Sequence, residues 1–541
     1  MSTCNCNCPC TCNSEAKCIC LEGKVEVVDQ NQQQLHSNCE TIEANLDAEA
    51  QNRLDGDATL QDQINTVSID ITALDGRVTQ NETDIADLQS LDGLLFDDVR
   101  RFGAVEGDQG TDTAAAMETA WATVQSASIP FGTFYIDRTA EIPDNCRLRG
   151  NGELSWNDAN SDVGTTAPTA SIYMVQGVGE VGPASPTRAG IRIEGVRFNG
   201  NGNNQSNMDA ALAAIALSGH DHSVENCTFR GFRAGDQKET FVINLHGTKI
   251  SSTNFPAYNN HVRNCKFYDG ANQTLAGSSL EFTQILIAGH AIGDDPDEIG
   301  QGCSVVGCEF YNLNNNGSQN RSIHGIAPLG DAVRVEGNRM FNCAGTTHMI
   351  WIQSVNTSNL LITGNQCGGI EHAVSLNENG DEVHEGIHIR DNVFNCTLAV
   401  INFFIGDVTG PSTGSGYVTG VIIEDNFLSN PNGSPVVIQI MDLSRRGTYK
   451  IVNNTLGRDD PTWPGVIVGW FEDDVAPFDP DAYGTGDTAL LHPDEFVVGD
   501  NMDTDTGRST KRAQISFNAS SGGGGYRSMT WAAHAEWPEI T

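Results

Sequence analysis

Acidic residues mark three places where this sequence could carry out acid–base chemistry: the loop 289–298, the segment 371–385 with its histidines, and Asp331. Hydrolysis of a glycosidic bond typically needs two carboxylates, about 5–5.5 Å apart for retention and about 6.5–9.5 Å apart for inversion. Lyase chemistry instead needs a base at a sugar carbon next to a carboxylate. The chain has 70 acidic residues, so a pair of carboxylates in the sequence is weak evidence by itself.

The candidate catalytic residues are Glu371, Asp331 and Asp381. Glu371 starts a predicted strand that carries a histidine, Asp381 opens a predicted loop over 381–385 that also carries one, and Asp331 directly precedes a strand. The alternative to a catalytic role for Glu371 and Asp381 is that they are surface charges beside hydrogen-bonded histidines. The alternative for Asp331 is that it is a turn residue. The acidic loop 289–298 is a further candidate, with a solvated or calcium-binding loop as its alternative. We expect no cofactor and no metal in the site.

A second group of residues could bind sugars. If the isoleucines of the strands near 350, 401 and 438 point inward, alternation places their neighbours on the outside. Aromatic rings can stack on sugars and amides can hydrogen-bond to them. The alternative is a face covered by a neighbouring chain. The predicted glycan-binding residues are Trp351, Gln353, Asn402, Phe404 and Gln439.

A short phrase that recurs between about residues 190 and 456 indicates what positions these side chains. It consists of a β-branched residue, any residue, Gly, Asn or Asp, then in most copies Cys or Asn, any residue, and a large apolar residue. Its closing residues are 27 to 43 apart, the spacing of a repeat architecture. The copies span 193–198, 224–229, 262–267, 305–310, 335–340, 362–367, 389–394, 423–428 and 451–456.

Each copy predicts a short strand followed by a residue that tolerates a left-handed turn. One copy cannot bury its apolar face alone, so the copies must stack. Stacking places one position of the phrase in a ladder of thiols and hydrogen-bonding amides. We therefore predict a parallel β-helix, rather than a sandwich of irregular hairpins, because the connections vary too much in length. The ladder reads Val196, Cys227, Cys265, Cys308, Asn338, Asn365, Asn392, Asn426 and Asn454.

The N-terminal region has a different composition. Eight of the 16 cysteines lie between residues 4 and 39, many in Cys-x-Cys spacing. That spacing disfavours simple local disulfides, which leaves metal binding, disulfides between chains or attachment to a partner as alternatives. Residues 25–59 are polar and compatible with a helix, with a predicted break near 54–57.

An apolar heptad seam follows over 60–88, with residues in steps of four and three. Its seam is narrower than the stripe by which a helix packs on a globular body, so it predicts a coiled-coil stalk. β-branched residues at one seam position, with Asn81 at the other, are compatible with three strands; the heptad pattern alone leaves two or three open. The seam residues are Leu60, Ile64, Val67, Ile71, Leu74, Val78, Asn81, Ile85 and Leu88.

The net charge of −40 argues against binding to nucleic acid or to an anionic membrane surface. A neutral or hydrated partner such as a sugar polymer is compatible with it. Residues 1–20 lack the apolar stretch of a secretion signal, and no apolar run approaches the length of a membrane helix. We therefore expect synthesis in a cytoplasm, without insertion into a membrane.

The segment 97–121 resembles the opening of the pectate-lyase-like superfamily, in which such a phrase runs into a helix that caps a right-handed parallel β-helix. It reads DDVRRFGAV, then GDQGTDTA, AAM and AW. Asp112 or Thr113 can cap a helix over 114–125. Residues 129–136 are similar to the first strand of that family and 148–152 to its next turn. The resemblance implies an all-β body over about 97–456.

The combination of a heptad helix with this opening resembles a bacteriophage tailspike. That resemblance implies a homotrimer on the virion tail that binds and usually cleaves a host surface polysaccharide, and a virion-binding N-terminus that contacts tail or portal-adaptor proteins. It divides the chain into 1–59 (attachment), 60–95 (neck), 96–157 (cap segment), 158–504 (β-helix) and 505–541 (cap or trimer contact). The alternatives are a non-enzymatic adhesin, a bacterial polysaccharide lyase or hydrolase, and a structural connector of the virion.

Overall fold

The computed structural model divides into two units, Met1–Leu91 and Asp92–Thr541, which are described separately. No helix of the described residues is both long and apolar enough to cross a membrane. The structure describes residues 30–57, 59–61, 63, 96–157, 172–177, 189–201, 212–234, 240–250, 253–255, 257–269, 271–272, 282–291, 301–315, 323–343, 346–353, 356–378, 383–405, 417–440, 447–457, 466–472, 496–499, 501–503, 509–510, 512–519 and 527–532.

In the first unit, residues 30–57 are helical without interruption. The predicted break near 54–57 is therefore wrong. Side-chain pairs one turn apart support the helix there, since Arg53 contacts Glu49 at 3.0 Å and Gln51 donates to Asp55 at 2.8 Å. Most of the heptad seam and the cysteine run at 4–20 lie outside the described residues.

The second unit opens as the resemblance implied. The 3-10 helix η1 (Val99–Phe102) is followed by α2 (Thr113–Val124). Asp112 caps α2, its side chain accepting from the backbone N–H of Ala114 at 3.0 Å. Residues 129–136 do not form one strand, as expected, but belong to two strands separated at Gly132, which has a φ of 127°.

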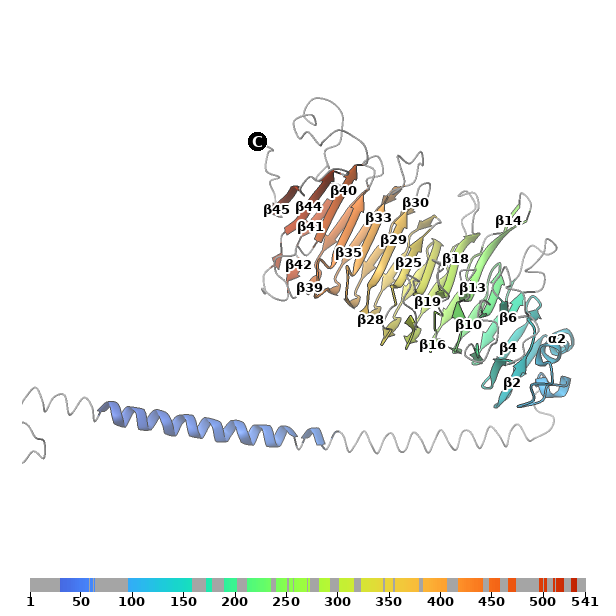
Figure 1. Ribbon diagram of the computed structural model, residues 1–541, viewed down its shortest axis with the longest axis horizontal. Coiled ribbons are helices and arrows are strands. Elements are labelled where there is room, and N and C mark those ends of the chain that lie inside the picture. The colour runs from blue at the N-terminus through green and yellow to red at the C-terminus, as the bar shows by residue number, and fades with distance from the viewer. Residues whose placement is uncertain are drawn as a thin grey trace, which may run out of the picture. The chain divides into compact units, whose positions relative to one another are not determined.

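Three long sheets form the body, and almost all their pairings are parallel (Figure 1). The first sheet contains, in spatial order, β1 (Ser126–Ile129), β4 (Arg147–Gly150), β7 (Arg192–Glu194), β10 (Ser223–Glu225), β15 (His261–Arg263), β19 (Ser304–Val306), β23 (Arg334–Glu336), β27 (Leu361–Thr363), β31 (His388–Arg390), β35 (Val421–Glu424), β38 (Tyr449–Val452) and β41 (Phe496–Gly499).

The second sheet follows the first along the chain, strand by strand. It contains β2 (Thr133–Ile136), β5 (Glu153–Trp156), β8 (Arg197–Asn199), β11 (Thr228–Arg230), β16 (Lys266–Tyr268), β20 (Glu309–Tyr311), β24 (Arg339–Phe341), β28 (Gln366–Ile370), β32 (Val393–Cys396), β36 (Phe427–Ser429), β39 (Thr455–Gly457), β42 (Asn501–Asp503) and the antiparallel β43 (Ser509–Thr510).

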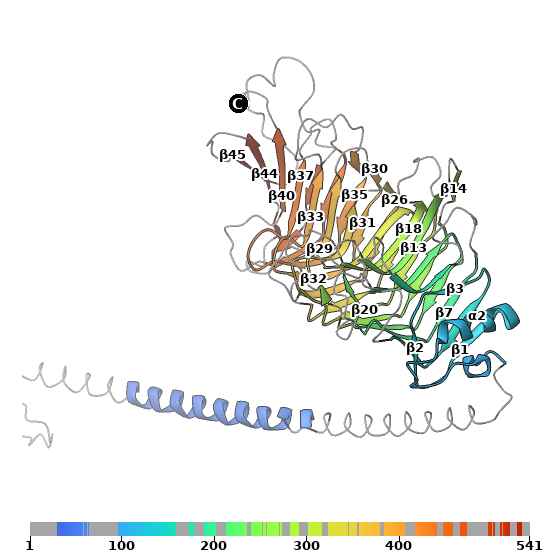
Figure 2. The ribbon, with the colours of Figure 1, turned by 45° about the vertical axis from the view of Figure 1, so that its right-hand side comes forward.

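The third sheet completes each turn of the chain, and Figure 2 shows its strands β29 and β33 in a different layer from β20 and β32. It contains β3 (Ala140–Ile142), β6 (Ile172–Gly177), β9 (Leu212–Ser218), β13 (Thr240–Ile250), β18 (Phe282–Ala291), β22 (Ile323–Asp331), β25 (His348–Gln353), β29 (His372–Glu378), β33 (Ile401–Ile405), β37 (Val436–Ile440), β40 (Val466–Glu472), β44 (Arg512–Ala519) and the antiparallel β45 (Arg527–Ala532).

Short strands occupy the corners. Those that follow the third sheet are β14 (Thr253–Phe255), β26 (Thr357–Ser358), β30 (Val383–Glu385) and β34 (Tyr417–Thr419), and those that follow the second are β12 (Arg233–Ala234), β17 (Ala271–Asn272) and β21 (Asn314–Asn315). The sheets include strands inside 96–157 and beyond 504, so they extend past both ends of the predicted body 158–504.

The recurring phrase is the corner between the first and second sheets, as predicted. In the copy at 224–229, β10 ends at Glu225, Asn226 adopts a φ of 55°, and β11 begins at Thr228. All nine copies have a positive φ at the corresponding residue. The chain therefore forms a parallel β-helix, and the hairpin sandwich is excluded because successive strands of each sheet come from successive turns.

The predicted ladder lies along this corner. Asn338, Asn365, Asn392, Asn426 and Asn454 are buried, and each side-chain amide donates to the next at 2.9–3.0 Å. The last partner is Asn501, which occupies the same position in a further copy of the phrase at 498–503. The thiols of Cys227, Cys265 and Cys308 continue the ladder toward the N-terminus and are buried too.

Candidate functional site

The predicted sugar-binding residues fall into two neighbouring rows on the third sheet. Trp351 pairs in register with Ser375, and Ser375 pairs with Asn402. The second row contains Gln353, Asn377, Phe404 and Gln439. The isoleucines beside Asn402 and Phe404 are buried whereas these two side chains are half-buried, so the predicted alternation is confirmed for β33.

Trp351 has a structural role as well. Its ring is half-buried and packs on the imidazoles of His324 and His348, with ring centroids 4.9 and 4.1 Å apart. Burial lowers the pKa of His348 well below its usual value, so one of the two rings that Trp351 covers is an uncharged histidine. Trp351, Asn402 and Phe404 are all half-buried on this face.

The structure does not bring Glu371 and Asp331 together. His324, His348 and His372 are in register on adjacent strands. Relative to this row of histidines, Glu371 lies one residue before His372 and Asp331 lies seven residues after His324. The two acidic residues are therefore about eight residues apart along the strand direction, roughly 25 Å at about 3.3 Å per residue. The two carboxylates cannot flank one glycosidic bond, for which about 9.5 Å is the upper limit.

Asp331 lies at a corner, where its carboxylate accepts from Ser358 Oγ at 2.9 Å and Asn359 Nδ2 at 2.7 Å. Asp381 and the end of the acidic loop 289–298 lie outside the described residues. The predicted loop 381–385 is wrong in its second half, because Val383–Glu385 forms β30 and pairs with β26 and β34.

His384, inside β30, is fully buried, and neither ring nitrogen has a hydrogen-bond partner among the described residues. Burial lowers its pKa to about 3. Its neighbour Glu385 is half-buried and accepts a hydrogen bond from the Tyr417 hydroxyl, which raises the pKa of that phenol. The corner therefore holds one buried neutral histidine and one carboxylate that is already hydrogen-bonded to Tyr417.

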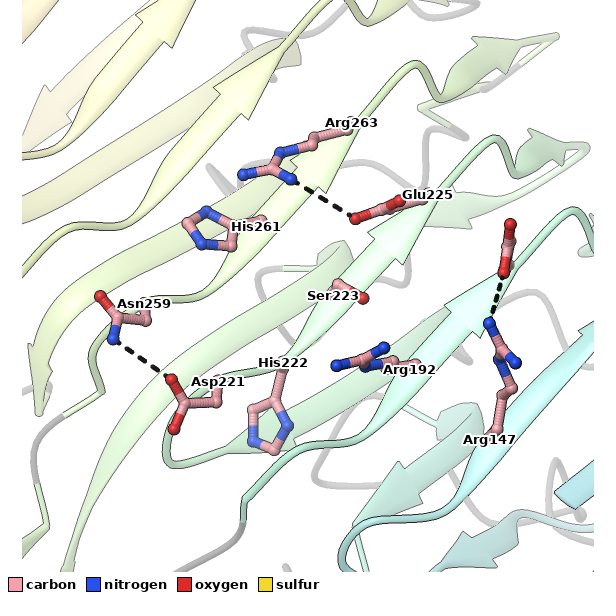
Figure 3. A pocket seen from close by; sticks show the side chains of 10 residues that line it. Arg147, Arg192, Asp221, His222, Ser223, Glu225, Asn259, His261 and Arg263 are labelled. Carbon is pink, nitrogen blue, oxygen red and sulfur yellow. Dashed lines mark hydrogen bonds and ion pairs between the residues drawn. The ribbon is translucent and has the colours of Figure 1, made fainter.

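Sequence reasoning missed a pocket of about 430 Å³ on the first sheet (Figure 3). Its floor is a row of outward residues on adjacent strands, in which Arg147 pairs in register with Arg192, Arg192 with Ser223, and Ser223 with His261. Adjacent strands of a sheet lie about 4.8 Å apart, so these four polar side chains form a row roughly 14 Å long.

The sides of the pocket carry charges of both signs. Arg147 contacts Glu194 at 3.1 Å, and Arg263 contacts Glu225 at 3.7 Å. The Arg192 side chain is exposed, and its guanidinium makes no hydrogen bond or ion pair with any described residue. The pocket therefore offers one unpaired guanidinium between two paired ones.

Two histidines in the pocket are uncharged at neutral pH. His222 is buried, accepts from the backbone N–H of Ile191 at 3.3 Å, and donates to the carbonyl of Ser218 at 3.0 Å. Burial lowers its pKa to about 4. Burial also lowers the pKa of His261, whose ring contacts Ser304 Oγ at 2.8 Å. The charges in the pocket are thus those of its arginines and carboxylates.

The signal for this pocket lies in the repeat itself. The residues on either side of the central β-branched residue in each copy point outward, and in three successive strands they are Arg192 and Glu194, Ser223 and Glu225, His261 and Arg263. A search of those positions would have found the row. Among the described residues, no group of three or more His, Cys, Asp or Glu side chains could hold a metal ion.

No family model matches the sequence, and no curated protein matches it. Solved parallel β-helix structures resemble it. The adhesin PfbA of Streptococcus pneumoniae has 14% identity and a TM-score of 0.46, over 69% of this chain and 99% of that one. An exopolygalacturonase from Thermotoga maritima has 10% identity and a TM-score of 0.45, over 81% and 94%.

A third structure, ORF18 of Geobacillus virus E2, has 16% identity and a TM-score of 0.33, over 60% of each chain. Identities of this size concern the architecture and say nothing about ligands or activity. The class of this protein is thus a parallel β-helix with an outward-facing polar pocket and a wall of half-buried aromatic and amide side chains.

Proposed function

We propose that this protein is a homotrimeric bacteriophage tailspike that binds and depolymerises a surface polysaccharide of its bacterial host. The observation that carries the proposal is the pair of adjacent rows on the third sheet, where Asn402 and Phe404 are half-buried on the outside of β33. An extended polymer running along the stacked strands would meet the same face on successive turns.

The N-terminal unit supports the trimer. The helix at 30–57 exposes Leu35, Ile42, Leu46 and Leu54, each 58–63% accessible in the single chain. Apolar side chains along a helix gain free energy by packing against partner helices. Together with the heptad seam at 60–88, they favour association of chains around a common stalk. We propose three chains, with the cysteine-rich N-terminus attached to the virion tail.

A non-enzymatic adhesin is the second candidate, favoured by the separation of Glu371 from Asp331. Incubation of the purified trimer with host polysaccharide distinguishes the two functions. A depolymerase releases new reducing ends or unsaturated sugars, whereas an adhesin binds the polymer and leaves its length unchanged. Absence of both binding and cleavage would refute the proposal, as would a monomer in sedimentation.

The binding face is tested with Phe404→Ala, because loss of one aromatic platform should weaken polysaccharide binding roughly tenfold. Phe427→Ala is the matched control, since Phe427 is an outward phenylalanine on the second sheet with 40% exposure. Trp351→Ala should also weaken binding but will destabilise the fold, because it uncovers His324 and His348. If the Phe404 variant binds the polysaccharide as tightly as the wild type does, the third sheet is not the binding face.

A further inference from the structure

We propose that the pocket on the first sheet binds an acidic sugar, with the sugar carboxylate against the guanidinium of Arg192. The inference rests on the proposed function in that the sugar would be a unit of the host polysaccharide. It concerns a different face of the β-helix from Phe404, so the two sites can fail separately.

The unpaired charge of Arg192 is the first argument. Arg147 and Arg263 have carboxylate partners at 3.1 and 3.7 Å, whereas Arg192 lies between them without a carboxylate partner among the residues that the structure describes (Figure 3). A planar guanidinium binds a carboxylate through two parallel hydrogen bonds. In a chain with a net charge of −40, an exposed arginine without a partner in an otherwise paired cluster is suited to an anion from outside.

The surrounding acceptors narrow the ligand class. Glu194, Glu225 and Asp221 line the same pocket, and Asp221 already accepts from Asn259 Nδ2 at 3.2 Å and contacts His220 at 2.7 Å. Carboxylates repel a second anionic group but accept hydrogen bonds from hydroxyls. A ligand that fits therefore carries one carboxylate and several hydroxyls, as a uronic acid does, whereas an inorganic anion or a nucleic acid offers the wrong balance.

The pocket is also preorganised. Its floor residues lie on β4, β7, β10 and β15, held in register by the sheet. His222 and Asn260 fix the corner beside it, since the backbone N–H of His222 donates to Asn260 Oδ1 at 3.0 Å and both residues are buried. A rigid site loses little conformational entropy when a ligand binds.

The test is a titration of the full-length protein with glucuronate and with glucose, which differ only in the carboxylate, observed by ligand NMR. We expect binding of glucuronate and none of glucose at the same concentration. Arg192→Gln should weaken glucuronate binding at least tenfold, because a charge-assisted pair is lost. Arg334→Gln is the matched control, as Arg334 is outward on the same sheet but pairs with Glu336 at 2.5 Å outside the pocket.

Three results would overturn the inference: equal binding of glucose and glucuronate, glucuronate binding unchanged in Arg192→Gln, or no glucuronate binding by the wild type. Displacement of glucuronate by equimolar sulfate would also overturn it, as it would indicate a site for any anion. These outcomes are separate from failure of the proposed function, in which host polysaccharide binding would be absent or insensitive to Phe404→Ala whatever glucuronate does.

Discussion

The inward and outward faces of the same strands differ in how they change from one turn to the next. On four successive turns of the second sheet the inward residue is always phenylalanine, and the outward residue before it is different each time: Arg197–Phe198, Thr228–Phe229, Lys266–Phe267 and Glu309–Phe310. The inward rings stack with centroids 4.8–5.1 Å apart. Stacking constrains the inside of the β-helix, and the outside is free to differ.

This difference between the two faces indicates where binding sites should be sought in a stacked repeat. The inward ladders show only that successive turns are in register. The pocket around Arg192 and the face around Phe404 both lie on outward rows, where neighbouring turns supply different chemistry at a spacing of about 4.8 Å. Substitutions on the two faces should therefore affect different properties.

The largest effect is expected inside. Phe267→Ala removes the ring that contacts both Phe229 and Phe310, and it should lower the free energy of unfolding by about 3–5 kcal/mol. Denaturant unfolding followed by circular dichroism measures it. A change below about 1 kcal/mol would mean that the stack contributes little, and the contrast between the two faces would be lost.

A somewhat smaller loss of stability is expected in the ladder, and it should differ between its asparagine half and its cysteine half. Asn392→Ala removes the acceptor of the Asn365 backbone N–H and side chain, at 2.8 and 3.0 Å, and should cost about 2–4 kcal/mol. The Cys265 thiol is a weak donor with a single hydrogen, which can reach the carbonyl of Val224 at 3.5 Å or that of Arg263 at 3.4 Å. Cys265→Ala should therefore cost about 1 kcal/mol. Equal losses in the same unfolding assay would show that both halves act by packing alone.

Acid should destabilise the folded protein through its buried histidine His384. The pKa of buried His384 is about 3 in the folded protein and about 6.5 when unfolded. Since the unfolded chain takes up the proton first, stability is complete above pH 6.5 and falls as the pH drops toward 3. At pH 5 the loss from this group is about 2 kcal/mol relative to pH 7.

His384→Leu should reduce the acid sensitivity by that amount, measured as unfolding midpoints at pH 7 and pH 5. His388→Gln is the outward control, because His388 is partly exposed and its ring contacts Glu424 at 2.9 Å. A variant of His384 with the same pH dependence as the wild type would contradict the buried neutral state.

The smallest effect is expected outside. Lys266 and Glu309 are 3.2 Å apart, with side chains 61% and 48% exposed. Lys266→Ala should change stability by at most about 0.5 kcal/mol, because exposed ion pairs are screened by solvent. Lys266→Ala and Phe267→Ala together compare the outward and inward faces of a single strand. A loss of stability for Lys266→Ala close to that for Phe267→Ala would contradict the difference between the two faces.

Most of the fold could be predicted from the repeat. The left-handed corner residues and the ladder follow from residue types at fixed positions, since stacking brings equivalent positions of successive copies together. The predicted break near 54–57 and the predicted loop at 383–385 are wrong because contacts that local composition does not reveal stabilise both segments. These are side-chain pairs one helical turn apart at 54–57 and strand pairing with neighbouring turns at 383–385.

The candidate sites could be predicted only in part. Alternation placed Asn402 and Phe404 outside correctly, but it could not show that Trp351 packs on His324 and His348. The carboxylates were chosen by type, and nothing in the sequence measured the roughly 25 Å along the strands between Glu371 and Asp331.

The recurring phrase is enough to specify a β-helix, because its apolar and corner positions are satisfied in every copy only when the copies stack. The composition alone sets the strong negative charge. Only the tertiary structure decided which outward residues meet. Arg147, Arg192, Ser223 and His261 are distant in the chain, and the lengths of the intervening loops hide their alignment. Register between turns, set by backbone hydrogen bonds in the sheets, is what places them in one row.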